Sequence, residues 1–332
     1  MLALRRTSAC FALALCLANP TFGASAAPWV PPAPGSHPVG FKRLHGPRGE
    51  VDTWYPASFK GASMRFVDLL ADSARTVAFL SGVHVPESEI AQLLSAPLAA
   101  TLGAEPGDVP CALVLLGQGN GGATEELALL AENLASHGYV VASTPSPMLR
   151  ASLEREDQVG EFAEMQARDL AAAVTAVAGA LPVDTTVVGV VGYSFGARGA
   201  LLLAMRNPRV RALVSLDGGI GTATGVASLR AAPSFRSGAA LPPVLHFYER
   251  LDSFMTPDFT LLRSLRTNSL TLREVRHVHH AQFTTYGYAT ARLPGLAAAM
   301  HAEAATTESL RAVIEETRSF LDRELQMRQA TP

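Results

Sequence analysis

From residue 112 onward, two kinds of hydrophobic pattern alternate along the chain. Short apolar runs rich in branched residues predict buried strands, and longer segments with apolar residues three and four positions apart predict helices. The predicted strands cover residues 112–116, 139–143, 185–191, 210–216, 244–248 and 269–275. The predicted helices cover residues 124–137, 161–180, 196–206 and 307–327. Strands that alternate with helices indicate an α/β fold, with a mostly parallel central sheet and helices on both faces.

The pattern before residue 112 is weaker. Proline-rich sequence without helical periodicity predicts an extended N-terminal arm over residues 27–50. A strand is predicted at residues 51–55, and helices at 64–80 and 87–102. No repeat or linker interrupts residues 51–332, which we interpret as one domain. Two irregular segments, near residues 145–165 and 218–242, could form a lid.

Residues 1–26 have the features of a secretory signal peptide. Arg5 and Arg6 precede an apolar run at residues 9–18, which is too short to span a bilayer. Small residues at positions 24–26 form a cleavage site. We therefore expect cleavage after residue 26 and a protein that is secreted or periplasmic.

Composition excludes several classes of partner. The formal net charge is −2 and no basic run occurs, so nucleic acid is not an expected partner. No second apolar stretch approaches 18 residues, so we expect no stable membrane insertion after the signal peptide is removed. Cleavage would leave Cys111 as the only cysteine, which rules out an intrachain disulfide and suggests a buried structural thiol.

The segment GYSFG at residues 192–196 carries the candidate chemistry. A G-x-S-x-G turn between a buried strand and a helix is a nucleophile elbow, which exposes the serine hydroxyl at the edge of the sheet. A plain glycine-rich turn is the alternative. The strand before this segment and the small residues after it favour the elbow, with Ser194 as nucleophile.

A serine nucleophile needs a base and an acid, expected in the chain order serine, acid, histidine. His280 lies just beyond the last predicted strand of the sheet and is the candidate base. Asp217 follows the strand after the elbow helix, and Asp252 follows the next strand. Either aspartate could orient the imidazole and stabilise its charged form.

The oxyanion of an ester transition state needs two backbone N–H donors. One is expected from Phe195, the residue after the nucleophile. The other is expected from the glycine-rich loop at residues 117–122, where we place it at Asn120.

No metal or organic cofactor is expected. His277 and His279 could form a metal pair, but no carboxylate or cysteine completes a site nearby, so solvated loop histidines are the favoured interpretation.

Several motifs in this order resemble the platelet-activating-factor acetylhydrolase and dienelactone-hydrolase-like group of α/β hydrolases. They are GQGNGG, LASHGYVVAS, GYSFGARGALLLA, VRALVSLDGG and HHAQF. The resemblance spans about residues 51–283. It implies an α/β-hydrolase fold, with Ser194 as nucleophile, His280 as base and Asn120 at the oxyanion position.

The resemblance also bears on the choice of acid. In the acetylhydrolase branch the acid follows leucine at the end of the strand after the elbow helix, which matches Asp217. Cutinase-like and dienelactone-type relatives place it one strand later, which matches Asp252. We favour Asp217. Two positions depart from the relatives, because Gln118 and Tyr193 stand where they usually carry histidine.

Together these residues predict an exported serine hydrolase that cleaves carboxylic esters through an acyl-enzyme. Its partner would be a small-molecule or acyl ester. One alternative is a cutinase-like polyester hydrolase that uses Asp252 as its acid. Another is a catalytically silent hydrolase fold that serves as a binding protein.

Overall fold

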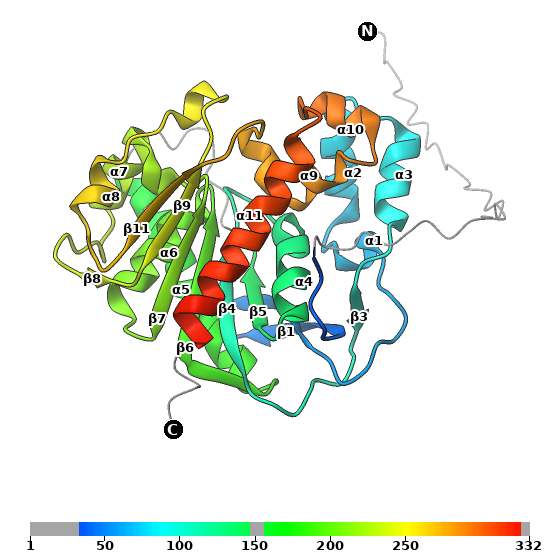
Figure 1. Ribbon diagram of the computed structural model, residues 1–332, viewed down its shortest axis with the longest axis horizontal. Coiled ribbons are helices and arrows are strands. Elements are labelled where there is room, and N and C mark those ends of the chain that lie inside the picture. Colours follow the sequence, from blue (N-terminus) through cyan, green and yellow to red (C-terminus); the bar gives the residue numbers. More distant parts are fainter. Residues whose placement is uncertain (1–32, 147–155, 327–332) are drawn as a thin grey trace, which may run out of the picture.

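The computed structural model describes residues 33–146 and 156–326 (Figure 1). The expected signal peptide lies outside the described residues, as does the middle of segment 145–165. The strands of the main sheet are β1 (Val39–Gly46), β2 (Gly49–Pro56), β3 (Ala100–Leu102), β4 (Cys111–Gly117), β5 (Val140–Thr144), β6 (Val183–Tyr193), β7 (Val210–Leu216), β9 (Val244–Tyr248) and β11 (Leu270–Glu274). Their spatial order is β11-β9-β7-β6-β4-β5-β2-β1-β3.

The strands from β11 to β5 are all parallel, whereas β2 is antiparallel to both of its neighbours. Strands β8 (Ala240–Leu241) and β10 (Arg266–Thr267) form a separate small pair. The parallel strands are apolar on both faces because both faces are covered. On β4, for example, Val114 and Leu116 belong to one core, and Leu113 and Leu115 to the other.

Helices cover the two faces of the sheet as separate layers (Figure 1). One layer contains α4 (Ala128–Ser136) and α11 (Thr306–Leu321). The other contains α5 (Glu156–Ala178) and α6 (Gly196–Arg206), and α7 (Ala223–Arg230) packs against α5. The α/β architecture expected from the sequence is therefore confirmed.

Two insertions that are far apart in sequence meet beside the carboxyl ends of the strands (Figure 1). The first contains α1 (Phe66–Leu69), α2 (Ser73–Gly82) and α3 (Glu87–Ser95), and the second contains α9 (Thr285–Ala289) and α10 (Pro294–Ala299). The carboxylate of Glu89 on α3 accepts the backbone N–H of Gly295 on α10 at 2.8 Å. The rings of Phe66 and Tyr286 also pack edge to face, so the two insertions form one cap.

The N-terminal arm predicted over residues 27–50 is wrong from residue 39 onward. Strand β1 pairs with β2 in a continuous antiparallel register, from Val39 opposite Pro56 to Gly46 opposite Gly49. Its polar positions obscured the strand pattern because they pair across the hairpin. Arg43, for example, donates to Asp52 at 2.6 Å. The folded domain therefore begins near residue 39, ahead of the predicted boundary at residue 51.

Other differences concern the edges of the fold. The helix predicted at residues 64–80 is split, because Asp72 caps a new helix by accepting the backbone N–H of Arg75 at 3.0 Å. The helix predicted at residues 87–102 ends at Ser95, and the chain continues into β3. Segment 218–242 contains α7 in place of irregular structure. Cys111 is half-buried at the start of β4, so the expectation of a buried thiol was wrong.

Candidate active site

Ser194 lies at a sharp turn between β6 and α6, at the carboxyl end of the sheet. Its φ angle is +53°, a left-handed conformation that costs energy for a residue with a side chain. A side chain at Gly192 would collide with the backbone of Ala197, and one at Gly196 with the carbonyl of Gly117. The glycines of G-x-S-x-G thus permit the close approach that this turn requires.

The side chains of Ser194, His280 and Asp217 form one hydrogen-bonded chain. His280 Nε2 lies 2.8 Å from Ser194 Oγ, and His280 Nδ1 lies 2.6 Å from Asp217 Oδ2. The exposed fraction is 3% for the Asp217 side chain and 12% for that of His280. A carboxylate held at Nδ1 fixes the tautomer that leaves Nε2 able to accept the serine proton.

Asp252 contacts the same histidine through a different atom. Its Oδ2 accepts the backbone N–H of His280 at 2.7 Å, and its Oδ1 lies 3.0 Å from Nδ1 of His279. Its carboxylate is therefore bonded to the backbone of the loop that carries His280, while the imidazole is bonded to Asp217. The structure brings both candidate acids to His280, but only Asp217 reaches the ring.

The imidazole of His280 is held between two aromatic side chains. The ring of Tyr193 stacks on it with centroids 5.2 Å apart, and Tyr193 donates its hydroxyl to the His280 carbonyl at 3.2 Å. The ring of Phe254 meets the imidazole edge to face at 5.4 Å. Tyr193 is the residue that departs from the histidine usual in relatives. No local sequence pattern indicates that Tyr193 packs against the candidate base.

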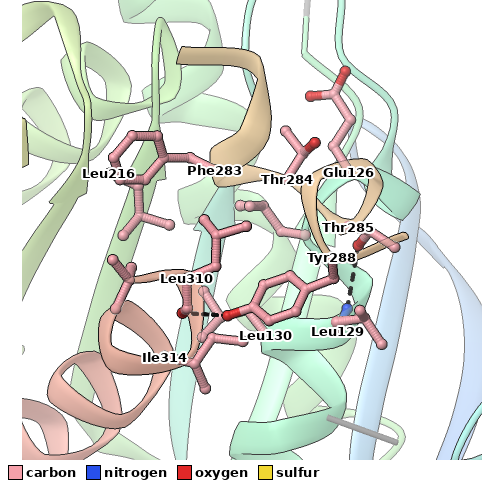
Figure 2. A pocket seen from close by; sticks show the side chains of 12 residues that line it. Glu126, Leu129, Leu130, Leu216, Phe283, Thr284, Thr285, Tyr288, Leu310 and Ile314 are labelled. Carbon is pink, nitrogen blue, oxygen red and sulfur yellow. Dashed lines mark hydrogen bonds between the residues drawn. The ribbon is translucent and has the colours of Figure 1, made fainter. Parts of the chain in front are cut away.

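Below the histidine loop, α9 is bound to both neighbouring helices (Figure 2). Thr285 accepts the backbone N–H of Leu129 on α4 at 3.3 Å, and the Tyr288 hydroxyl donates to the carbonyl of Leu310 on α11. The apolar cavity among these residues measures about 20 Å³, which is room for about one water molecule. This region supports the loop and is too small for a substrate.

The two expected oxyanion donors lie on adjacent strand ends. Phe195 begins α6 in helical conformation, where the first backbone N–H groups have no partner within the helix. Asn120 is the exposed residue of an otherwise buried turn directly after β4. Gly117 is the last residue of β4 before that turn, and it packs against Gly196, two residues after Ser194. The loop and Ser194 are therefore neighbours.

Gln118, the other departure from the relatives, points into the protein. It is fully buried and donates to the hydroxyl of Ser143 at 2.7 Å, while its backbone carbonyl accepts from Gln166 at 2.9 Å. These bonds hold the start of the loop in place. The substitution therefore changes how the start of the loop is supported.

Glu126 lies behind the same loop and was not singled out by the sequence. Its carboxylate is close to Gly119 and Gly122, and it also lines a cavity beside Tyr193 and His280. Burial raises the pKa of Glu126 to about 7, and the charge of Glu125 acts in the same direction. Glu126 is thus a weakly acidic group next to the candidate oxyanion loop.

The remaining histidines of the cluster do not form a metal site. His277 lies 2.7 Å from the carboxylate of Glu303, on the surface, whereas His279 lies against Asp252. Within residues 33–146 and 156–326, no group of three or more histidine, cysteine or acidic side chains could hold a metal ion.

The same residues contain no helix that is both long and apolar enough to cross a membrane.

A comparison with known families bears on this geometry. The model of the dienelactone hydrolase family matches residues 99–258, slightly less than half of the chain, a segment that includes both Ser194 and Asp217. The chain is an α/β hydrolase. A lactone is a cyclic carboxylic ester, so the family match assigns the hydrolase to the carboxylic ester hydrolases, as the sequence motifs indicated.

A solved structure supports the fold of the hydrolase. It is similar to a ferulic acid esterase from Streptomyces cinnamoneus with a TM-score of 0.68. The two are 22% identical, over 91% of this chain and 93% of that one. At this identity the likeness concerns the fold. No curated protein matches the hydrolase in sequence.

Proposed function

We propose that the hydrolase is an exported serine esterase whose catalytic triad is Ser194, His280 and Asp217. The observation that carries this proposal is the continuous chain of hydrogen bonds from Ser194 Oγ through both imidazole nitrogens to Asp217. This arrangement activates a hydroxyl that would otherwise be a weak nucleophile at neutral pH.

In the first step, Ser194 Oγ attacks the ester carbonyl carbon while His280 Nε2 takes the serine proton. The tetrahedral intermediate collapses as the bond from carbon to the alcohol oxygen breaks. His280 returns the proton to that oxygen, which leaves as the alcohol and yields an acyl-enzyme on Ser194.

In the second step, His280 takes a proton from a water molecule whose oxygen attacks the acyl carbon. The bond to Ser194 Oγ breaks, His280 returns the proton to the serine, and the carboxylic acid leaves. Asp217 keeps its negative charge throughout and stabilises the imidazolium. Backbone N–H groups of Phe195 and Asn120 would stabilise both oxyanions.

The arrangement around Asp252 argues against the two alternatives. A cutinase-like mechanism with Asp252 as acid would need its carboxylate at Nδ1 of His280, where Asp217 lies. The Asp252 carboxylate instead contacts His279 and the His280 backbone. A catalytically silent fold would have no need for a buried serine–histidine–aspartate chain with these distances.

Hydrolysis of p-nitrophenyl esters from acetate to palmitate tests the proposed activity. Esters of aromatic acids such as ferulic acid belong in the same series, because a protein of similar fold carries that name. We expect turnover that is lost in Ser194→Ala and kept in Ser95→Ala, which changes an exposed serine on α3. Full turnover in Ser194→Ala would overturn the assignment of the nucleophile.

The proposed export rests on the N-terminal sequence. Fractionation of cells that express the full chain, followed by N-terminal sequencing, should give a protein outside the cytoplasm that begins at residue 27. A cytoplasmic protein with residues 1–26 intact would contradict export and leave the esterase proposal standing.

A further inference from the structure

A cavity of about 360 Å³ opens beside the candidate triad, between the two insertions of the cap. It is lined by residues of α2, α10 and the loop that carries His280. His280 is part of its wall, whereas Ser194, Asn120 and Phe195 are not. Among the described residues, the cavity therefore reaches the candidate base directly, and it meets the glycine-rich loop only through Glu126, which lies against Gly119 and Gly122.

The wall of this cavity is mainly apolar. Leu80 and Leu296 are buried in it, and Met300 also lines it. At the mouth, Phe79 and Phe254 have exposed fractions of 60% and 67%. Large apolar side chains that are exposed around an apolar cavity are typical of a ligand site, because the ligand then removes them from water.

Two acidic side chains, Asp252 and Glu126, line this cavity. Asp252 lines the cavity, but its two carboxylate oxygens are engaged by His279 and by the backbone of His280. A charged occupant would gain little from a carboxylate with both oxygens bonded. It would also gain little from Glu126, because burial raises the pKa of that carboxyl group to about 7 and so lowers its charge near neutral pH. The apolar surface therefore sets the chemistry of the occupant, which should be uncharged.

We propose that this cavity binds the alcohol part of the ester, as an uncharged apolar group attached to the leaving oxygen. The assignment rests on the proposed function. His280 must place its proton on the leaving oxygen, so the group attached to that oxygen lies on the histidine side of the scissile bond. The oxyanion donors hold the carbonyl oxygen, and the acyl substituent leaves the same carbon in a third direction, so it would lie outside this cavity.

The volume sets the size of the group. An apolar protein cavity of about 150 Å³ is large enough to bind benzene. At about 360 Å³, this cavity is roughly twice as large as one that binds benzene. It can therefore hold a benzyl group or the larger naphthylmethyl group. Methyl esters would leave it empty and should be poorer substrates for the same acid.

Two series of esters test this assignment. One keeps the acid as acetate and varies the alcohol through methyl, butyl, benzyl and naphthylmethyl. The other keeps the alcohol as methanol and lengthens the acid from acetate to decanoate. Hydrolysis is followed by proton release, so that the leaving group needs no chromophore. For the wild-type protein we expect kcat/KM to rise with the size of the alcohol.

The decisive variant fills the cavity from α10. Ala299 lines the cavity, whereas its neighbour Ala298 is exposed and outside the lining, which makes Ala298→Phe a matched control. We expect Ala299→Phe to lower kcat/KM for benzyl acetate, relative to methyl acetate, at least about 10-fold. Ala298→Phe should leave that ratio unchanged, and neither variant should change the ranking of the methyl esters by acid length.

A second variant fills the cavity from the end of α2. Val83 is exposed at the end of α2 and lines the mouth, so Val83→Trp is expected to fold and to act like Ala299→Phe. A larger loss for long acids than for large alcohols would overturn the assignment, as would an unchanged ratio in both variants. No hydrolysis of any ester by the wild-type protein would instead contradict the proposed function.

Discussion

The ends of strands β7 and β9 each supply an aspartate to the same histidine, and the two differ in which atom they reach. Asp217 follows β7 directly in a left-handed conformation, with φ +43°, and its side chain is 3% exposed at the ring of His280. Asp252 begins the short helix after β9 with φ −95° and is 23% exposed at the backbone of His280.

Glu249 connects the two regions. Its backbone N–H donates to Asp217 at 3.2 Å, and its carboxylate accepts the backbone N–H of Asp252 at 3.0 Å. In the proposed mechanism, Asp217 sets the tautomer and charge of the His280 imidazole, whereas Asp252 holds the backbone of His280 in place. Mutations at the two aspartates should separate these effects.

The largest effect is expected for Asp217→Asn. An asparagine keeps the shape but favours the wrong imidazole tautomer and cannot stabilise the imidazolium, so kcat should fall about 10³–10⁴-fold with little change in KM. Steady-state kinetics on p-nitrophenyl acetate measures this. Wild-type kcat in this variant would contradict the role of Asp217.

A smaller effect is expected for Asp252→Asn. This variant replaces a charged acceptor of the His280 N–H with a neutral one, which should cost about 1–2 kcal/mol in positioning and lower kcat roughly 10-fold. Asp258→Asn, which changes a half-buried aspartate six residues farther along the chain, is the matched control. If Asp252→Asn loses more activity than Asp217→Asn, the comparison between the two aspartates is reversed.

A third variant examines the other side of the imidazole. Tyr193→Phe keeps the stacked ring and removes only the hydroxyl that donates to the His280 carbonyl. The loss of one neutral hydrogen bond should lower kcat about threefold. Tyr193→Leu, which also removes the stacking, should lose more. Equal kinetics for both variants would show that the ring does not position the base.

The smallest effect on activity is expected at a carboxyl outside the site. Glu132 on α4 accepts the backbone N–H of Ala100 at 2.9 Å, and burial raises its pKa from 4.5 to about 7. The folded protein then holds a proton that the unfolded chain loses near pH 4.5. This contribution to stability is therefore present at low pH and is lost as pH rises to about 7.

Glu132→Gln has no such proton to lose. Between pH 5 and pH 8, its free energy of unfolding should therefore fall less than that of the wild-type protein, by on the order of 2 kcal/mol. Urea unfolding at both pH values measures this, and kcat at a fixed pH should stay near the wild-type value. An identical pH dependence would mean that Glu132 is ionised in the folded protein.

The sequence predicts the centre of the fold better than its edges. The bounds of α6, β7 and β9 match the predicted ranges because these elements are buried among apolar neighbours and have a clear pattern. Strand β1 was missed because its polar side chains pair across a hairpin. That pairing is a contact with β2 that no local pattern records.

The candidate site shows the same limit. Ser194 could be predicted from the strand–turn–helix motif around it. His280 could be predicted from its place after the last strand in the chain order serine, acid, histidine. Choosing between Asp217 and Asp252 depends on the path of the chain after two parallel strands, which only the folded structure gives. The stacking of Tyr193 on His280 likewise joins residues 87 positions apart in the chain.

The most direct test of the central claim is mass spectrometry of the acyl-enzyme. The protein is mixed with p-nitrophenyl acetate, quenched in acid within the first turnovers, and digested. We expect an acetyl group on the peptide that contains Ser194, and much less of it in His280→Ala, because no base then takes the serine proton. Turnover of the ester without any adduct on Ser194, or with the adduct on another residue, would contradict the account.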